Sequence, residues 1–160
     1  MKQKVRIIKE GKGRDCYTSI DFFKKHYHEL GKITHVVFYY AEHEWAIYRK
    51  NPDMYHQFTI FIGEKAQLWT SGFTWGYCGA GPGALHDVLL LIDPSISYDE
   101  ITHLEWEARI PIMLQNVQGR LIEKPFSDDA KALICSHKGF LPWEDRRMEF
   151  PECFFNNLGF

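Results

Sequence analysis

The sequence has no excess of basic residues. Its 160 residues include 19 Lys and Arg against 21 Asp and Glu, which gives a net charge of −2 at pH 7. Proteins dedicated to nucleic-acid binding usually carry clustered positive charge that neutralises phosphate groups. We therefore expect no dedicated nucleic-acid binding.

Long apolar runs are missing as well. The longest fully apolar run, Val88 to Ile92, is far shorter than the ~20 residues that a membrane-spanning helix needs. The first residues, MKQKVRIIKEGKGRD, contain no apolar stretch of the kind found in a secretory signal peptide. The sequence thus predicts a cytoplasmic protein without a membrane partner.

Cysteine pairs and clustered metal ligands are also absent. No C-x-x-C pair occurs, and widely separated cysteines in a cytosolic protein are typically free thiols. His26 and His28 form an H-x-H pair, but residues two apart on a predicted helix point in different directions. We expect neither a bound metal nor a cofactor. The four cysteines are Cys16, Cys78, Cys135 and Cys153.

Most of the predicted strands lie in the first half of the chain. Residues 33–40, ITHVVFYY, are rich in the β-branched and aromatic side chains that favour strands. Residues 4–10 and 44–50 also have strand-like patterns, and residues 57–62 and 65–71 flank Gly-Glu as in a hairpin.

The predicted helices follow from apolar spacing and from capping residues. Thr18 or Ser19 is a candidate cap for the first helix. Ser97 and Glu100 have the spacing of a capping box, and Pro111 should kink the helix that they begin. The expected helices cover residues 19–30, 82–92, 95–119 and 128–137.

The order of these elements indicates the fold class. Strands come mainly first and helices later, which favours an α+β fold over alternating βαβ units. We expect a single domain over residues 1–160, with an antiparallel sheet that helices cover mainly on one face.

The most unusual stretch, FTWGYCGAGPGALHDVLL, covers residues 73–90 and is dense in glycine. It joins a predicted strand to a predicted helix, whose first N–H groups attract phosphate or carboxylate. It lacks the G-x-x-x-x-G-K-[ST] pattern, because Ala84 and Leu85 follow Gly83. Its glycines have the spacing G-x-G-x-G, so it also lacks the dinucleotide-binding pattern G-x-G-x-x-G. A plain strand–turn–helix junction is the structural alternative.

These observations lead to a binding hypothesis in which the partner is an anionic small molecule that bears phosphate and is derived from a nucleotide. Backbone amides of the glycine-dense stretch would hold the phosphate, and aromatic rings would stack on a base. We expect binding without catalysis. The predicted ligand-binding residues are Trp69, Trp75, Gly76, Tyr77, Gly79, Gly81, Pro82, Gly83, Arg146 and Arg147.

The same stretch resembles the short signature F-x-W-G-Y-G-G-x-G-P-x-x-L-x-x-x-L-L of a small uncharacterised domain family of bacteria and their phages. This chain has Cys78 where the signature has glycine, so the pattern needs no thiol there. The resemblance implies a shared loop, and its occurrence in phages suggests a nucleotide-sequestering protein that blunts host defence signalling. The matching residues are Phe73, Trp75, Gly76, Tyr77, Gly79, Gly81, Pro82, Leu85, Leu89 and Leu90.

An enzyme acting on a nucleotide-like substrate is the first alternative. Cys78 precedes a predicted helix, where a thiol can be activated, and His86 is a candidate base. Asp99, His103 and Glu107 recur every four residues and would form one stripe of a long helix. A solvated helix face explains such a stripe equally well.

A protein-interaction module, such as an inhibitor or immunity factor, is the second alternative. Residues 140–160 are rich in aromatic side chains that suit a contact surface, or else pack on the body of the protein. Arg146 and Arg147 lie in this tail and could equally pair with neighbouring acids. The sequence is compatible with a monomer or a homo-oligomer.

Overall fold

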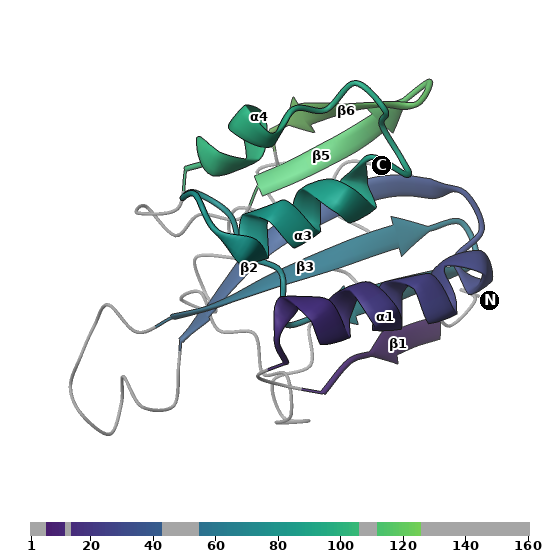
Figure 1. The fold of residues 1–160 in the computed structure, drawn as a ribbon. Helices are drawn as coiled ribbons and strands as arrows, with labels where there is room; N and C mark the ends of the chain where they lie inside the picture. The colour runs from purple at the N-terminus through teal and green to yellow at the C-terminus, as the bar shows by residue number, and fades with distance from the viewer. Residues whose placement is uncertain (1–5, 12–13, 43–54, 106–111, 126–160) are drawn as a thin grey trace.

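The structure, a computed structural model, describes residues 6–11, 14–42, 55–105 and 112–125, and side chains are described only outside residues 39–42 and 55–56. These residues form one sheet of six strands in the order β1-β4-β3-β2-β5-β6 (Figure 1). β1 runs parallel to β4, and the other neighbouring strands are antiparallel. The strands are β1 Arg6–Lys9, β2 Ile33–Glu42, β3 Tyr55–Gly63, β4 Ala66–Thr70, β5 Ile112–Val117 and β6 Arg120–Lys124.

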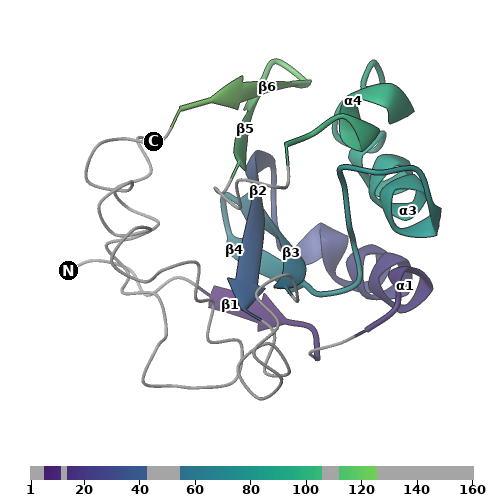
Figure 2. The same cartoon turned by 90° about the vertical axis from the view of Figure 1, so that its left-hand side faces the viewer.

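Helices α1 (Cys16–His26), α3 (Ala80–Leu89) and α4 (Tyr98–Thr102) lie on the same face of this sheet (Figure 2). A short 3-10 helix, Tyr27–Glu29, follows α1. The prediction of an α+β domain with helices on one face is confirmed. Among the described residues, no helix has the length and apolar character needed to cross a bilayer.

The main core lies between the helices and the sheet. Phe61 of β3 packs against Phe23 of α1, with ring centroids 4.7 Å apart, and its ring makes a T-shaped contact with that of Phe73. Leu85 and Leu89 bring the apolar face of α3 into the same cluster. Successive strand residues point to opposite faces. The sheet therefore has a second set of buried side chains on its other face, among them Val37, Phe58, Ile60 and Met113.

Helix α1 begins three residues earlier than the sequence predicted. The side chain of Asp15 caps it by accepting a hydrogen bond from the Thr18 N–H at 2.8 Å. Hydrogen bonds from the backbone and the side chain of Thr18 hold the pKa of Asp15 below its usual range. Neither Thr18 nor Ser19 is the cap, because Ser19 is buried inside the helix and bonds to another group.

The predicted helix over residues 95–119 is wrong. Its capping box is present at Ser97 and Glu100, but α4 ends at Thr102 and residues 112–124 form the hairpin of β5 and β6. Gln118 and Gly119 turn this hairpin with φ angles of 54° and 85°. Such left-handed pairs are typical of two-residue hairpin loops, and the Asn116 side chain accepts the Gly119 N–H at 2.8 Å. The predicted strand at 44–50 and helix at 128–137 lie outside the described residues.

This turn yields a stability prediction. Gln118 has a left-handed backbone that asparagine adopts more readily, so Gln118→Asn should raise the free energy of unfolding by about 0.5–1 kcal/mol. Urea unfolding of the two proteins measures the difference. A lower stability of the variant would show that the Gln118 conformation carries no cost.

Candidate functional site

The glycine loop, which we define as residues 71–83, runs from the end of β4 to the first turn of α3. Its start is tied to a buried carboxylate. Glu10 accepts hydrogen bonds from the Ser71 N–H at 2.9 Å and from the Ser19 hydroxyl at 2.7 Å. The Ser19 hydroxyl oxygen in turn accepts the Gly72 N–H at 2.9 Å. Burial raises the pKa of Glu10 against these hydrogen bonds, which would lower it.

Both tryptophans of the predicted site are buried. Trp75 has no exposed surface, and its ring lies 4.9 Å from that of Phe38, centroid to centroid. Trp69 lies under Lys9, whose ammonium nitrogen is 5.1 Å from the ring centroid. The indole N–H of Trp69 donates to the Gln67 side chain. Neither indole therefore presents a ring face to solvent. Trp75 fixes the loop to the core instead.

Tyr77 is the exposed ring of the loop, with 48% of its surface accessible. Its hydroxyl shares a hydrogen bond of 2.7 Å with the Thr74 hydroxyl. The loop reaches Tyr77 through Gly76, whose φ of 85° favours glycine and whose N–H donates to the Ile101 carbonyl at 3.0 Å. This bond joins the loop to α4.

The start of α3 is uncapped by any side chain. Its N-cap residue is Gly79, so the cap position offers no side-chain acceptor to the helix. A helix leaves its first N–H groups without intrahelical partners. Here Pro82 has no N–H and Gly83 donates to the Gly79 carbonyl at 3.1 Å, which leaves the amides of Ala80 and Gly81. Together with the helix dipole they form a local positive end.

Two tyrosine hydroxyls frame this helix start. The Tyr98 hydroxyl accepts the Gly79 N–H at 3.0 Å. The Tyr77 hydroxyl would lie 3.2 Å from a Cβ added to Gly81, and the same Cβ would overlap the Thr74 hydroxyl. A Cβ added to Gly83 would meet nothing within 4 Å. The loop therefore packs tightly against Gly81 and leaves open space at Gly83.

The groups of the predicted enzyme are differently placed. Cys78 is exposed, while the Nε2 of His86 hydrogen-bonds to the Ile96 carbonyl at 2.9 Å. The stripe predicted for Asp99, His103 and Glu107 does not form within the described residues, because α4 ends at Thr102. His103 lies at the helix end, where its Nδ1 bonds to the Asp99 carbonyl at 2.8 Å, and Glu107 lies outside the described residues.

Other predicted residues take no part in this site. His26 pairs with Glu29, which also binds Arg6 at 2.7 Å, and His28 is exposed beside them. Within the parts of the chain that the structure describes, no three metal-ligating side chains gather. Arg146, Arg147 and the tail 140–160 lie outside the described residues.

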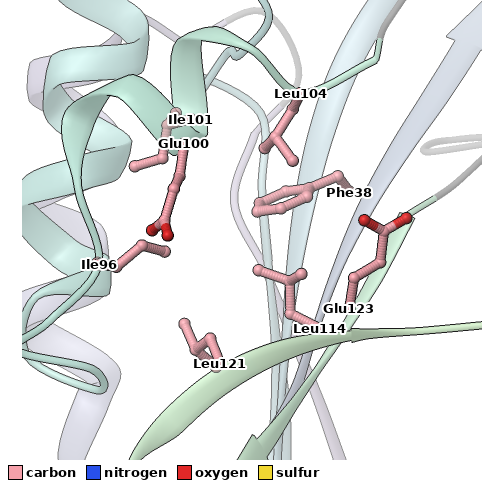
Figure 3. Close-up of a pocket in the computed structure, with 8 residues that line it drawn as sticks. All are labelled: Phe38, Ile96, Glu100, Ile101, Leu104, Leu114, Leu121 and Glu123. Atoms are coloured by element: carbon pink, nitrogen blue, oxygen red, sulfur yellow. The ribbon is translucent and has the colours of Figure 1, made fainter.

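A cavity of about 270 Å³ was missed by the sequence analysis. It lies between α4 and the β5–β6 end of the sheet (Figure 3). Its lining comes from segments far apart in the chain, so no local motif marks it. The lining residues are Phe38, Ile96, Glu100, Ile101, Leu104, Leu114, Leu121 and Glu123.

Comparison with known proteins adds no relative. No protein-family model, curated protein or solved structure matches the chain. The resemblance of residues 73–90 to the bacterial and phage signature therefore rests on their sequence pattern alone and stays a prediction.

Proposed function

We propose that the protein binds a small phosphate-bearing ligand, nucleotide-derived in class, at the start of α3. The observation that carries this proposal is the uncapped first turn of α3, where the amides of Ala80 and Gly81 adjoin an exposed tyrosine. Unpaired amides at a helix N-terminus are suited to a phosphate group. The open space at Gly83 gives room beside them.

Tyr77 would supply the stacking surface, a role that the sequence analysis gave to Tyr77 together with Trp75 and Trp69. Its exposed ring adjoins the helix start, and its hydroxyl and that of Tyr98 lie within reach of the same turn. A base would stack on the ring while the phosphate meets the amides. The proposed ligand thus combines an aromatic ring system with an anionic group.

Binding without catalysis is favoured for this site. His86 is held by the Ile96 carbonyl, and the Asp99–His103–Glu107 stripe is not assembled on α4. A sequestering protein needs only tight binding, in keeping with the phage-type role that the loop signature suggests. If Cys78→Ala were to abolish turnover of a nucleotide-like substrate while the protein stayed folded, the protein would be an enzyme instead.

A thermal-shift screen against nucleotides, cyclic nucleotides and ADP-ribose-type molecules tests the proposal. Ligand at one hundred times its dissociation constant should add about 2.7 kcal/mol to the free energy of unfolding. Tyr77→Ala should weaken binding by about 1–3 kcal/mol through lost stacking. Tyr77→Phe should keep the contribution of ring stacking to the binding free energy and lose only the contribution of the hydroxyl group.

Tyr17→Ala is the matched control, because Tyr17 is an exposed tyrosine on α1 with 68% of its surface accessible. We expect it to leave binding unchanged. Absence of stabilisation by every anionic ligand would refute the proposal, and so would equal losses for the Tyr77 and Tyr17 variants.

A further inference from the structure

We infer that the cavity beside α4 is a second binding site, for a small apolar ligand that carries one ammonium group. This inference is independent of the anion site proposed above. It rests on the volume of the cavity, the apolar character of its walls and the negative charge at its edges.

The walls of the cavity are apolar and come from four parts of the fold. Phe38 of β2 and Leu114 of β5 form one side, Ile101 of α4 faces them, and Leu104, which follows α4, lies beside Phe38 (Figure 3). Ile96, Ile101 and Leu114 are buried, whereas Leu104 and Leu121 are half-buried. The cavity therefore opens to solvent along its α4 and β6 edges, and its interior favours an apolar group.

Two exposed carboxylates are the charged groups of the lining. Glu100 reaches from α4 past Ile96 into the space, and Glu123 rises from β6 beside Leu114 (Figure 3). One oxygen of Glu100 accepts the Ser97 N–H at 3.0 Å, which leaves Oε1 for a ligand. Among the described lining residues there is no basic side chain to neutralise either group. The edges are thus complementary to a cation.

The volume limits the size of the ligand. At about 270 Å³ the cavity is slightly smaller than the roughly 300–1,000 Å³ of sites that hold drug-sized ligands. A single ring or short branched chain with an aminoethyl group fits this limit. The ring would occupy the space between Phe38 and Ile101, and the ammonium group would face Glu100.

Three probes of similar size and different charge test the inference: phenethylammonium, 3-phenylpropanol and 3-phenylpropionate. Binding is followed by methyl NMR at Leu104, Leu114 and Leu121, which reports the location directly. We expect saturable shifts of these methyls with phenethylammonium, weaker binding of the alcohol and weakest binding of the anion. Added salt should weaken the ammonium ligand more than the alcohol.

Charge-neutral variants separate the carboxylates from the apolar walls. Glu100→Gln keeps the capping hydrogen bond, since glutamine also suits that position. Each of Glu100→Gln and Glu123→Gln should weaken phenethylammonium about 2- to 5-fold, the range for one exposed charge pair. Glu64→Gln is the control, because Glu64 is an exposed acid that does not line the cavity.

Leu121→Phe fills part of the space and should abolish the binding. Should that variant fail to fold, the methyl shifts of the unaltered protein still decide the matter. The inference is overturned if the three methyls do not respond to phenethylammonium. It is also overturned if 3-phenylpropionate binds as tightly, or if neither glutamine variant at the cavity differs from Glu64→Gln.

Discussion

Gly72→Ala should destabilise the protein by about 3 kcal/mol, the upper end of the cost of overpacking a well-packed site. A Cβ on Gly72 would overlap the backbone carbonyl of Asp15 and the hydroxyl of Ser19. The Asp15 carbonyl belongs to the N-cap of α1 and cannot rotate away as a side chain would. The substitution must therefore push the glycine loop from α1 and stretch its bond to Ser19.

Gly83→Ala is the matched control for this experiment. Gly83 lies inside α3, and an added methyl group meets nothing within 4 Å. Alanine in a helix is more stable than glycine by about 0.5–1 kcal/mol, so this variant should be more stable than the unaltered protein. Chemical denaturation measures both. Equal effects of the two substitutions would contradict the packing described for the loop.

Asp93→Ala should lower the free energy of unfolding by about 2–4 kcal/mol. Asp93 is only 4% exposed, and one of its oxygens accepts both the N–H and the hydroxyl of Ser95, at 2.8 and 2.6 Å. The other oxygen accepts the Leu121 N–H at 2.9 Å, which ties the segment that follows α3 to edge strand β6. Hydrogen bonds to a charged group contribute about 1.5–3 kcal/mol each, but Ser95 is exposed and Leu121 only half-buried, so water can replace part of this contribution in the variant.

The contribution of Asp93 should depend on pH. Burial alone would raise its pKa, but the hydrogen bonds from Ser95 and Leu121 outweigh burial and hold the pKa below its usual range. A lowered folded-state pKa stabilises the protein above the unfolded pKa of about 4, and this stability is lost as pH falls through the folded pKa.

Urea unfolding of the unaltered protein and Asp93→Asn between pH 7 and pH 3 measures this dependence. The difference in stability should be constant at neutral pH and shrink below about pH 4. Taking the difference cancels the opposite contribution of Glu10, whose pKa burial raises. Asp21→Asn, at an exposed position on α1, should show no comparable change. A difference that grows as the pH falls would contradict the proposed role of Asp93.

Local sequence signals predicted much of the sheet and two of the helices. The β-branched and aromatic run at 33–40 forms most of β2, and the β3–β4 hairpin turns directly after Gly63, the last residue of β3. The apolar spacing at 82–92 corresponds to α3, although the helix begins earlier, at Ala80. These elements depend on patterns within a few residues, which a single sequence displays.

The β5–β6 hairpin was missed because distant contacts determine it. Ile112 continues the helical spacing of Ile101, Leu104 and Ala108 in the sequence, and Pro111 was interpreted as a kink rather than as the residue before a strand. In the structure β5 pairs with β2, with Phe38 opposite Ile112. The Gln118-Gly119 pair was the local signal for a hairpin loop.

Of the candidate site, the sequence predicted the strand–loop–helix arrangement but not the exposure of its rings. Composition cannot distinguish a stacking tryptophan from a core tryptophan. Trp75 is buried because Phe38, far away in the sequence, supplies its partner ring. Tyr77, two residues later, is exposed because Gly76 turns the chain with a φ of 85°.

The central claim, that a phosphate-bearing ligand binds at the start of α3, is tested most directly by amide NMR. Titration with adenosine monophosphate and with adenosine compares the same base with and without the anion. We predict that the amide resonances of Ala80 and Gly81 shift and saturate with the monophosphate and respond far less to adenosine. Unchanged Ala80 and Gly81 amides with the monophosphate and with the other nucleotides of the screen would contradict the account.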